Sequence, residues 1–113
     1  MEEYIRIGNI DISKYQDLCS DKILTEEVIF TYKQIEHTNQ KHQNIYEKYK
    51  EKLKDVIENP DYIIEDTKHK ETGLVIKKYS KDVVIVLRLN TENRSNKNSI
   101  ITIWEIKEKR LER

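Results

Sequence analysis

The stretch Val83-Val-Ile-Val-Leu-Arg-Leu89 is the longest apolar run of the sequence. A run of this length that is rich in β-branched residues predicts a buried strand rather than a helix. Hydrophobic stretches flank it at residues 73–79 and 99–106. The short link at 80–82 indicates a tight hairpin, whereas the link at 90–98 is longer and wholly polar. Three consecutive antiparallel strands are therefore expected, with 83–89 in the middle.

Arg88 departs from the pattern of this strand. It places a charge near the end of the most apolar run, where a charge should point out of the core or meet a partner. Because side chains alternate along a strand, Arg88 shares a face with Val84 and Val86. Arg88 is therefore the first candidate site residue.

Helical patterns precede these strands. Residues 32–40 indicate a helix with Thr31 as its N-cap, and residues 44–58 carry the strongest helical signal, which Pro60 ends. The apolar stripe of the second helix repeats every four residues and is expected to pack on the sheet; it consists of Ile45, Tyr49, Leu53 and Ile57. Shorter elements are expected as a strand at 4–7, a helix capped by Ser13 and running to about Cys19, a strand or helix run-in at 26–31, and a strand at 62–66.

This layout predicts the fold class α+β, with N-terminal helices packed on a four-stranded, or slightly larger, antiparallel β-sheet. The 113 residues are expected to form a single domain. We divide it into an N-terminal extension (1–27), a core (28–107) and a charged tail (108–113).

Composition limits the compartment. The lone Cys19 cannot form an internal disulfide, which favours a reducing environment. No stretch approaches the roughly 20 apolar residues of a membrane span, and the acidic N-terminus has no signal-peptide character. A cytoplasmic protein without a membrane partner is the expectation.

The formal net charge of zero conceals an asymmetry. Residues 1–67 hold nine basic and 15 acidic residues, whereas residues 68–113 hold 12 basic and six acidic ones. A basic sheet half is a footprint for a polyanion such as a nucleic acid. The same pattern also fits ordinary solvated lysines.

Motifs for cofactor chemistry are missing from the sequence. His37 and His42 are five residues apart, and no His-Glu-x-x-His, paired-cysteine or glycine-rich phosphate motif occurs. Nothing in the sequence marks a partner base for Cys19. We therefore expect no metal and no cofactor.

A cofactor-free set of candidates remains: His37 as acid or base, Lys77 and Arg88 as cations, and Ser99 and Thr102 as hydroxyls. A two-residue turn after residue 79 would put Lys77 on the Arg88 face, and a three-residue turn would exchange it for Lys78.

Trp104 shares a face with Thr102 and could stack a base beside the phosphate-binding charges. Other roles stay open for three of these residues: Lys77 as a solvated lysine, Trp104 as core and His37 as a surface residue.

Four blocks together resemble one known family: Thr31-Tyr-Lys-Gln-Ile-Glu-His37 with His42 shortly after, Asn59-Pro-Asp-Tyr-Ile63, Thr72-Gly-Leu-Val-Ile-Lys77 and Lys97-Asn-Ser-Ile-Ile-Thr102. From about Val28 to Trp104, the chain is similar to the phage-associated branch of the barnase–EndoU–colicin–RelE-like nucleases.

The resemblance implies helices followed by a four-stranded antiparallel sheet, and metal-independent ribonuclease activity encoded by a phage or mobile element. By position, His37 and Lys77 match charged motif residues, while Asn98, Ser99 and Thr102 match the last block. Arg88 lies on the strand where these proteins often carry a catalytic cation. Thr38 departs from the hydrophobic residue that commonly follows the helix histidine.

The expected function is an endoribonuclease in which a ribose 2′-hydroxyl attacks the adjacent phosphate. His37 would take the proton, and Lys77 and Arg88 would stabilise the phosphorane. Ser99 or Thr102 would bind a phosphate oxygen. His42, Asn98 and Trp104 are substrate-binding candidates, and His42 could also protonate the leaving group.

RNA is the expected partner, with an inhibitor or a host protein as a further candidate; the oligomeric state is left open. The alternative is a non-catalytic phage protein that binds nucleic acid or a host protein through the same basic face. A structural protein would instead predict an exposed apolar patch.

Overall fold

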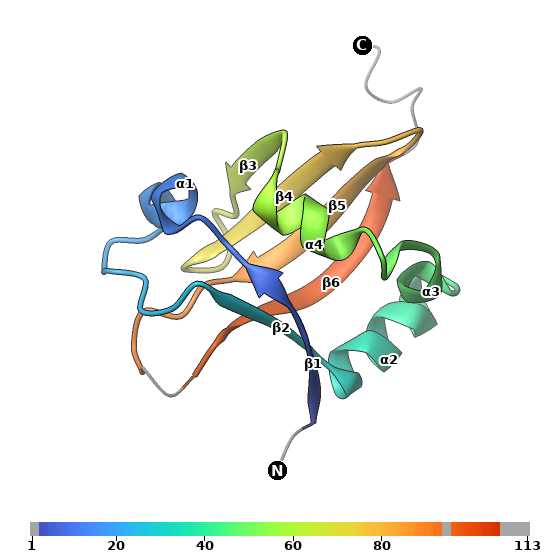
Figure 1. The fold of residues 1–113 in the computed structure, drawn as a ribbon, viewed down its shortest axis with the longest axis horizontal. Helices are drawn as coiled ribbons and strands as arrows, with labels where there is room; N and C mark the ends of the chain where they lie inside the picture. Colours follow the sequence, from blue (N-terminus) through green and yellow to red (C-terminus); the bar gives the residue numbers. More distant parts are fainter. Residues whose placement is uncertain (1–2, 94–95, 107–113) are drawn as a thin grey trace.

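A six-stranded sheet is the centre of the computed structural model, which describes residues 3–93 and 96–106 (Figure 1). The strands are β1 (Tyr4–Asn9), β2 (Glu27–Thr31), β3 (Tyr62–Glu65), β4 (Thr72–Lys78), β5 (Asp82–Arg88) and β6 (Asn98–Ile106). They lie in the order β1-β2-β6-β5-β4-β3, so the predicted middle strand is β5. The α+β class is confirmed. The four strands β3 to β6 are antiparallel as expected, and β2 joins β6 in parallel and extends the sheet.

The helices are α1 (Ile12–Tyr15), a 3₁₀ turn η1 (Gln16–Leu18), α2 (Tyr32–Lys41), α3 (Ile45–Tyr49) and α4 (Leu53–Glu58). In Figure 1, α4 lies in front of β4 and β5. Helix α2 starts directly after β2 because Thr31 caps it: the Thr31 hydroxyl accepts a hydrogen bond from the backbone N of Gln34 at 3.1 Å. No helix in the described part of the chain is long and apolar enough to cross a membrane.

The expected single helix over 44–58 is wrong, because residues 50–52 form a break between α3 and α4. Its apolar stripe is nevertheless buried throughout, as predicted. A repeat of four residues advances by about 40° per step around a helix of 3.6 residues per turn. A straight helix would therefore turn the end of the stripe away from the sheet, whereas the break lets both halves face it.

The expected short helix capped by Ser13 is also different. Asp11 is the cap, since its Oδ1 accepts from the backbone N of Ser13 at 3.1 Å, and α1 ends at Tyr15 before the 3₁₀ turn. The buried Tyr15 hydroxyl donates to the carbonyl of Ile57 at 2.7 Å. The N-terminal extension thus contributes to the core through Ile10, Tyr15 and Ile23.

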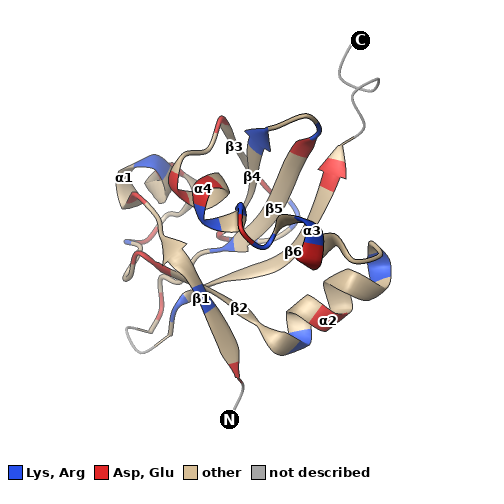
Figure 2. Cartoon of the chain, turned by 45° about the vertical axis from the view of Figure 1, so that its right-hand side comes forward, with Lys and Arg blue, Asp and Glu red and all other residues tan. Residues whose placement is uncertain are grey.

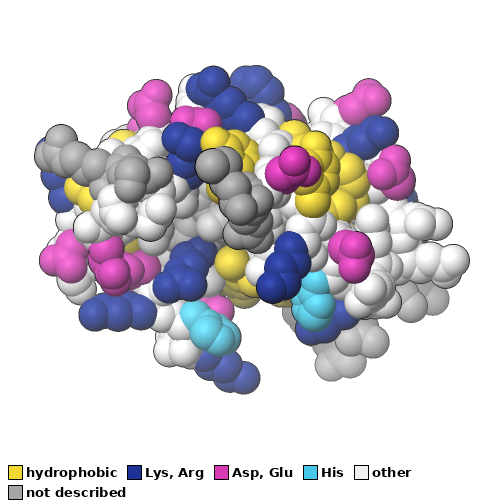
Figure 3. All heavy atoms as spheres, turned by 90° about the horizontal axis from the view of Figure 1, so that it is seen from below, with side chains coloured by type: hydrophobic (Ala, Val, Ile, Leu, Met, Phe, Trp, Pro, Cys, Tyr) yellow, Lys and Arg dark blue, Asp and Glu magenta, His cyan; other side chains and the backbone are white. Residues whose placement is uncertain are grey.

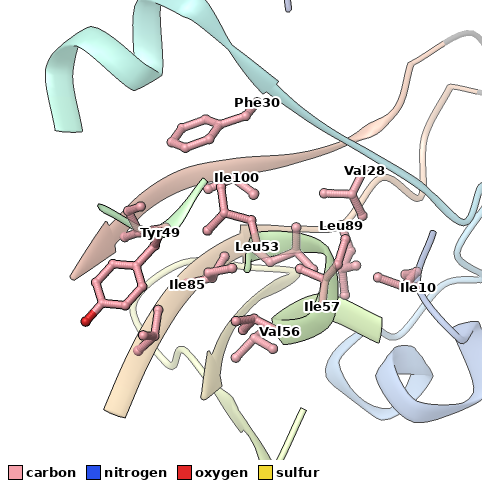
Figure 4. Close-up of a cluster of buried hydrophobic side chains, with 14 of the residues drawn as sticks. Ile10, Val28, Phe30, Tyr49, Leu53, Val56, Ile57, Ile85, Leu89 and Ile100 are labelled. Atoms are coloured by element: carbon pink, nitrogen blue, oxygen red, sulfur yellow. The ribbon is translucent and has the colours of Figure 1, made fainter. Parts of the chain in front are cut away.

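The main core lies between the sheet and the helices α3 and α4 (Figure 4). Val83, Ile85 and Leu87 alternate along β5 and point into it, which is the burial predicted for this strand. On the opposite face of the sheet, Ile76 and Val84 are also buried but lie outside this core cluster. The sheet therefore has one face covered by helices and a second apolar face.

Leu53 tests the core assignment. It is 0% exposed at the start of α4, so we expect Leu53→Ala to lower the free energy of unfolding by about 2–5 kcal/mol. Chemical denaturation measures this change. Ile64→Ala is the control, because Ile64 is 48% exposed on β3 and should lose about 1 kcal/mol or less. A loss below about 0.5 kcal/mol for Leu53→Ala would exclude the stripe from the core.

Hydrogen bonds to the carboxylate of Glu105 connect α3 to β6. The Tyr49 hydroxyl donates to Oε2 of Glu105, and Lys48 Nζ lies 2.9 Å from the same oxygen. The Tyr49 hydrogen bond, followed by that of Lys48, lowers the pKa of the Glu105 carboxyl from its ordinary value of 4.5. A lowered carboxyl pKa stabilises the fold above the unfolded-state pKa, and this stability is lost as the pH falls through the folded-state pKa.

We therefore expect Tyr49→Phe to destabilise the protein by about 1.5 kcal/mol at neutral pH. The difference from wild type should shrink as the pH falls from 4.5 through the lowered pKa of Glu105, where the folded-state carboxyl becomes protonated. Thermal unfolding across this pH range measures it. Tyr4→Phe is the control, since Tyr4 is 44% exposed. A difference that stays constant with pH would show that Glu105 is not responsible.

Candidate functional site

The second face of the sheet carries four of the predicted site residues: Arg88, Ser99, Thr102 and Trp104. Val86 pairs with Thr102, and Arg88 pairs with Ser99, so these four side chains share one face with Val84. The core-facing side chains of α4 pack on the other face. Arg88 is exposed at the end of β5, as a charge next to an apolar strand should be.

A first hollow of about 480 Å³ surrounds Arg88 and Ser99. Thr31, Asn90 and Lys97 also line it. Within residues 3–93 and 96–106, Arg88 forms no ion pair, whereas Lys97 Nζ lies 3.1 Å from Oε1 of Glu27. The guanidinium of Arg88 therefore keeps its hydrogen-bond donors available to a ligand in this hollow.

Glu71 is a residue of this hollow that the sequence patterns did not single out. Its backbone is left-handed, with a φ of 59°, and its carboxylate accepts a hydrogen bond from the Thr91 hydroxyl. The backbone N of Leu89 donates to the Glu71 carbonyl at 2.8 Å. Glu71 thus adds a proton acceptor to the hollow that contains Arg88. No local signal identifies it, because the pairing of β4 with β5, in which Thr72 lies opposite Arg88, brings Glu71 to the hollow.

A second hollow of about 330 Å³ contains His37 and Thr102. A β-bulge in β6 shifts the pairing between Val86 and Leu87, and both Ile101 and Thr102 line this hollow as a result. The Thr38 hydroxyl donates to the Thr102 hydroxyl at 3.2 Å, which holds α2 against β6. Thr38, which replaces the hydrophobic residue common at this position of the family motif, therefore helps to position α2 on β6.

Two lysines flank His37 on α2. Lys33, His37 and Lys41 are four residues apart, lie on one exposed side of the helix and all line the second hollow. Neither lysine forms an ion pair with a described residue. Figure 2 shows these basic positions towards the two ends of α2, with an acidic one between them. The four-residue spacing of Lys33, His37 and Lys41 is visible in the sequence, but only the structure shows that all three side chains line one hollow.

The two hollows adjoin along β6. Ser99 lines the first and Thr102 the second, and their partners Arg88 and Val86 are two residues apart on β5, a rise of about 7 Å. In Figure 3, the view from below, histidine side chains lie beside lysine or arginine side chains. This face is suited to bind an anionic polymer through more than one phosphate.

Lys77 does not join this set. Strand β4 pairs with β5 through Lys77 and Val83, and Lys78 pairs with Asp82, so three residues form the turn. Lys77 therefore lies on the face opposite Arg88, and Lys78 takes its place, which is the alternative expected for a three-residue turn. Its Nζ donates to the carbonyl of Asn59 at 2.8 Å and lies 4.0 Å from Asp61.

The remaining predicted site residues lie outside both hollows. Asn98 is 0% exposed. Its side-chain Oδ1 accepts from the backbone N of Asn90 and its Nδ2 donates to the carbonyl of Thr25, at 2.8 Å each, so it connects two loops. His42 ends α2, is exposed and does not line the His37 hollow. Trp104 is partly exposed and pairs with Val84. It lies two residues after Thr102 on β6, on the same face of the sheet.

The described residues contain no group of three or more His, Cys, Asp or Glu side chains placed to hold a metal ion. Burial, together with the charges of Glu71 and Asp21, raises the pKa of the Cys19 thiol to about 11. A thiolate nucleophile is therefore disfavoured at Cys19.

The sequence profile of the family described as phage-Barnase-EndoU-ColicinE5/D-RelE like nuclease3 matches residues 5–113. The chain belongs to this family. The match confirms the resemblance, and it begins before the first quoted block and includes β1. No curated protein and no solved structure matches the chain. Membership in a phage-associated nuclease family supports a nuclease function and a nucleic-acid substrate.

Arg88 tests whether the second sheet face binds nucleic acid. We expect Arg88→Ala to weaken binding of a single-stranded 2′-O-methyl RNA, which resists 2′-hydroxyl attack, by about tenfold or more. The slope of log affinity against log salt should fall by about 0.7, the value for one phosphate contact on a single strand. Fluorescence anisotropy at several salt concentrations measures both quantities.

Lys77→Ala is the matched control, because it removes one positive charge from the opposite face. It should leave RNA affinity unchanged. Equal losses in both variants would mean that net charge, and not this face, determines binding. Arg88→Ala should change the free energy of unfolding by no more than about 0.5 kcal/mol, and an unfolded variant would identify Arg88 as a structural residue.

Proposed function

We propose that this protein is a metal-independent endoribonuclease that cleaves RNA by attack of a ribose 2′-hydroxyl on the adjacent phosphate. The observation that supports this best is the position of His37. It lines a hollow with the Thr102 hydroxyl and two lysines, and that hollow adjoins the one containing Arg88 and Ser99. Family membership supports nuclease chemistry independently.

In this proposal His37 accepts the proton of the 2′-hydroxyl, since histidine exchanges protons near neutral pH. Its side chain is exposed on α2 and therefore accessible to a substrate. Arg88 stabilises the charge that develops on the phosphorane, and the hydroxyls of Ser99 and Thr102 donate to phosphate oxygens.

Lys33 and Lys41 take the electrostatic part that the sequence motif suggested for Lys77. Both flank His37, whereas Lys77 lies on the other side of the sheet. A phosphate beside His37 would therefore meet positive charge from two directions along α2. This arrangement needs no metal ion, because lysine and arginine supply the charge stabilisation.

Glu71 is a second candidate for proton transfer. Cleavage needs one group that takes a proton from the 2′-hydroxyl and one that protonates the leaving oxygen. Glu71 shares the hollow of Arg88, and His37 lies in the adjoining one. The pair could therefore act on opposite sides of a phosphate between the hollows.

One observation favours a non-catalytic binding protein as the second candidate. Arg88 and His37 line separate hollows, so a phosphate bound tightly by Arg88 alone would lie outside the reach of His37. Such a protein would bind RNA, or a host protein that mimics its charge, without cutting it.

Substitution of His37 decides between these candidates. We expect His37→Ala to lower the rate of RNA cleavage by about 10²–10⁴-fold in buffer with a chelator, because it removes a general base. RNA affinity and thermal stability should barely change. Gel analysis of a labelled RNA measures cleavage, and a 2′,3′-cyclic phosphate product identifies 2′-hydroxyl attack.

His69→Ala is the control, since His69 is exposed in the loop before β4 and pairs with Asp66 at 3.1 Å. Its cleavage rate should equal that of wild type. Cleavage that survives His37→Ala but is lost in Glu71→Gln would move the base to the Arg88 hollow. Wild-type protein that binds RNA and cuts none would favour the binding protein.

A further inference from the structure

The second sheet face is organised as three cross-strand rows. Pairing across β3, β4, β5 and β6 forms one row from Tyr62, Ile76, Val84 and Trp104, and the next from Ile64, Leu74, Val86 and Thr102. The third row runs across β4, β5, β6 and β2 and contains Thr72, Arg88, Ser99 and Ile29. Neighbouring rows are about 7 Å apart, the rise of two strand residues. The face thus changes from polar and cationic at one end to aromatic and aliphatic at the other.

The apolar part of this face is open. Among the described residues, α3 and α4 lie over the other face, and α2 lies beside β6 and β2 (Figure 1). Tyr62 is 51% exposed, Ile64 is 48% exposed, and Leu74, Val86 and Trp104 are partly exposed. Val84 is nevertheless 1% exposed although no described helix covers it. Its cross-strand neighbours Ile76 and Trp104 flank it on this face and add to the apolar surface.

We propose that this surface is a stacking platform for unpaired bases of the RNA, centred on Trp104, and that the substrate class is single-stranded RNA. The proposal rests on the proposed function for the position of the phosphates. Trp104 is one alternation, about 7 Å, beyond Thr102. A phosphate bound beside Thr102 and His37 therefore has its own base over Trp104.

Charge and composition favour nucleotides as the occupant. Every base has a flat apolar face that stacks on aromatic rings, while its phosphate needs cations nearby. The platform offers a tryptophan at one side, and Arg88, Lys33 and Lys41 border the hollows next to it. At the opposite side, Lys78 Nζ lies 5.2 Å from the centroid of the Tyr62 ring, which adds a cation.

The same geometry excludes paired substrates. Bases in a duplex are stacked on each other and cannot lie flat on a protein surface. The central side chains of the platform, such as Val86 and Leu74, carry no hydrogen-bond donors or acceptors. Stacking on such a surface tolerates any base, so we infer little sequence preference at this position.

Trp104 is the one tryptophan of the chain, which makes it a specific fluorescent reporter. We expect a single-stranded 2′-O-methyl RNA of mixed sequence to quench tryptophan fluorescence on binding, and the same sequence as a duplex to leave it unchanged. Trp104→Ala should weaken single-strand binding by about 5- to 150-fold, the range for loss of one stacked base. Trp104→Phe should retain most of the affinity, because it keeps a ring.

Ile64→Glu provides a second variant that does not depend on refolding around Trp104. Ile64 is exposed at the edge of the platform, so the variant should fold and should weaken single-strand binding. Ser20→Glu is the matched control, since it adds the same charge at an exposed turn and should bind normally.

Unquenched binding, with equal affinity in wild type, Trp104→Ala and Ile64→Glu, would overturn the platform even if the protein cleaves RNA. Wild-type self-association that Ile64→Glu abolishes, without change in RNA affinity, would also overturn it and identify an interface between copies. Quenching and affinity losses without any cleavage would keep the platform and reject the proposed nuclease mechanism instead.

Discussion

The pairing of β5 between β4 and β6 is the constraint on which this structure depends. Side chains of a strand alternate between two faces, so one register decides the face of every residue on three strands at once. In the observed register Val83, Ile85 and Leu87 enter the core under the helices. Val84, Val86 and Arg88 consequently form the open face, together with their partners on β6. The core and the candidate site are thus two consequences of a single alternation.

Two irregularities then bring α2 to this face. The parallel contact between β2 and β6 covers only the pairs Val28–Asn98 and Ile29–Ser99, after which the chain turns into α2. The bulge in β6 lets both Ile101 and Thr102 face that helix. Bulges often redirect side chains beside functional sites, and here the bulge unites the histidine of a helix with the hydroxyl of a strand.

Basic side chains from both halves of the sequence border the open face. Lys33 and Lys41 come from the acidic half of the chain, yet they border the same face as Arg88 from the basic half. Other carboxylates are stabilised by hydrogen bonds: those from Tyr79 and Asn59 lower the pKa of Asp55, and those from Lys54 and the backbone of Asn9 lower that of Glu58. A cation without an ion-pair partner is available to a phosphate, so Arg88, Lys33 and Lys41 favour an anionic ligand, although Glu71 and Glu92 also line the first hollow.

The sequence by itself determined the elements whose signals are local: the apolar run of β5, the four-residue stripe from Ile45 to Ile57, and the cap at Thr31. The exposure of Arg88 was expected from a charge at the end of an apolar strand, whereas the bulge in β6 places both Ser99 and Thr102 on the face of Arg88. Only the tertiary structure decided that Lys77 lies on the other face, because a single extra turn residue reverses every side chain of a strand. It also decided that Asn98 is buried and that Glu71, Lys33 and Lys41 join the site. These positions depend on loop packing, a bulge and a parallel strand contact between distant segments, none of which leaves a periodic pattern in the chain.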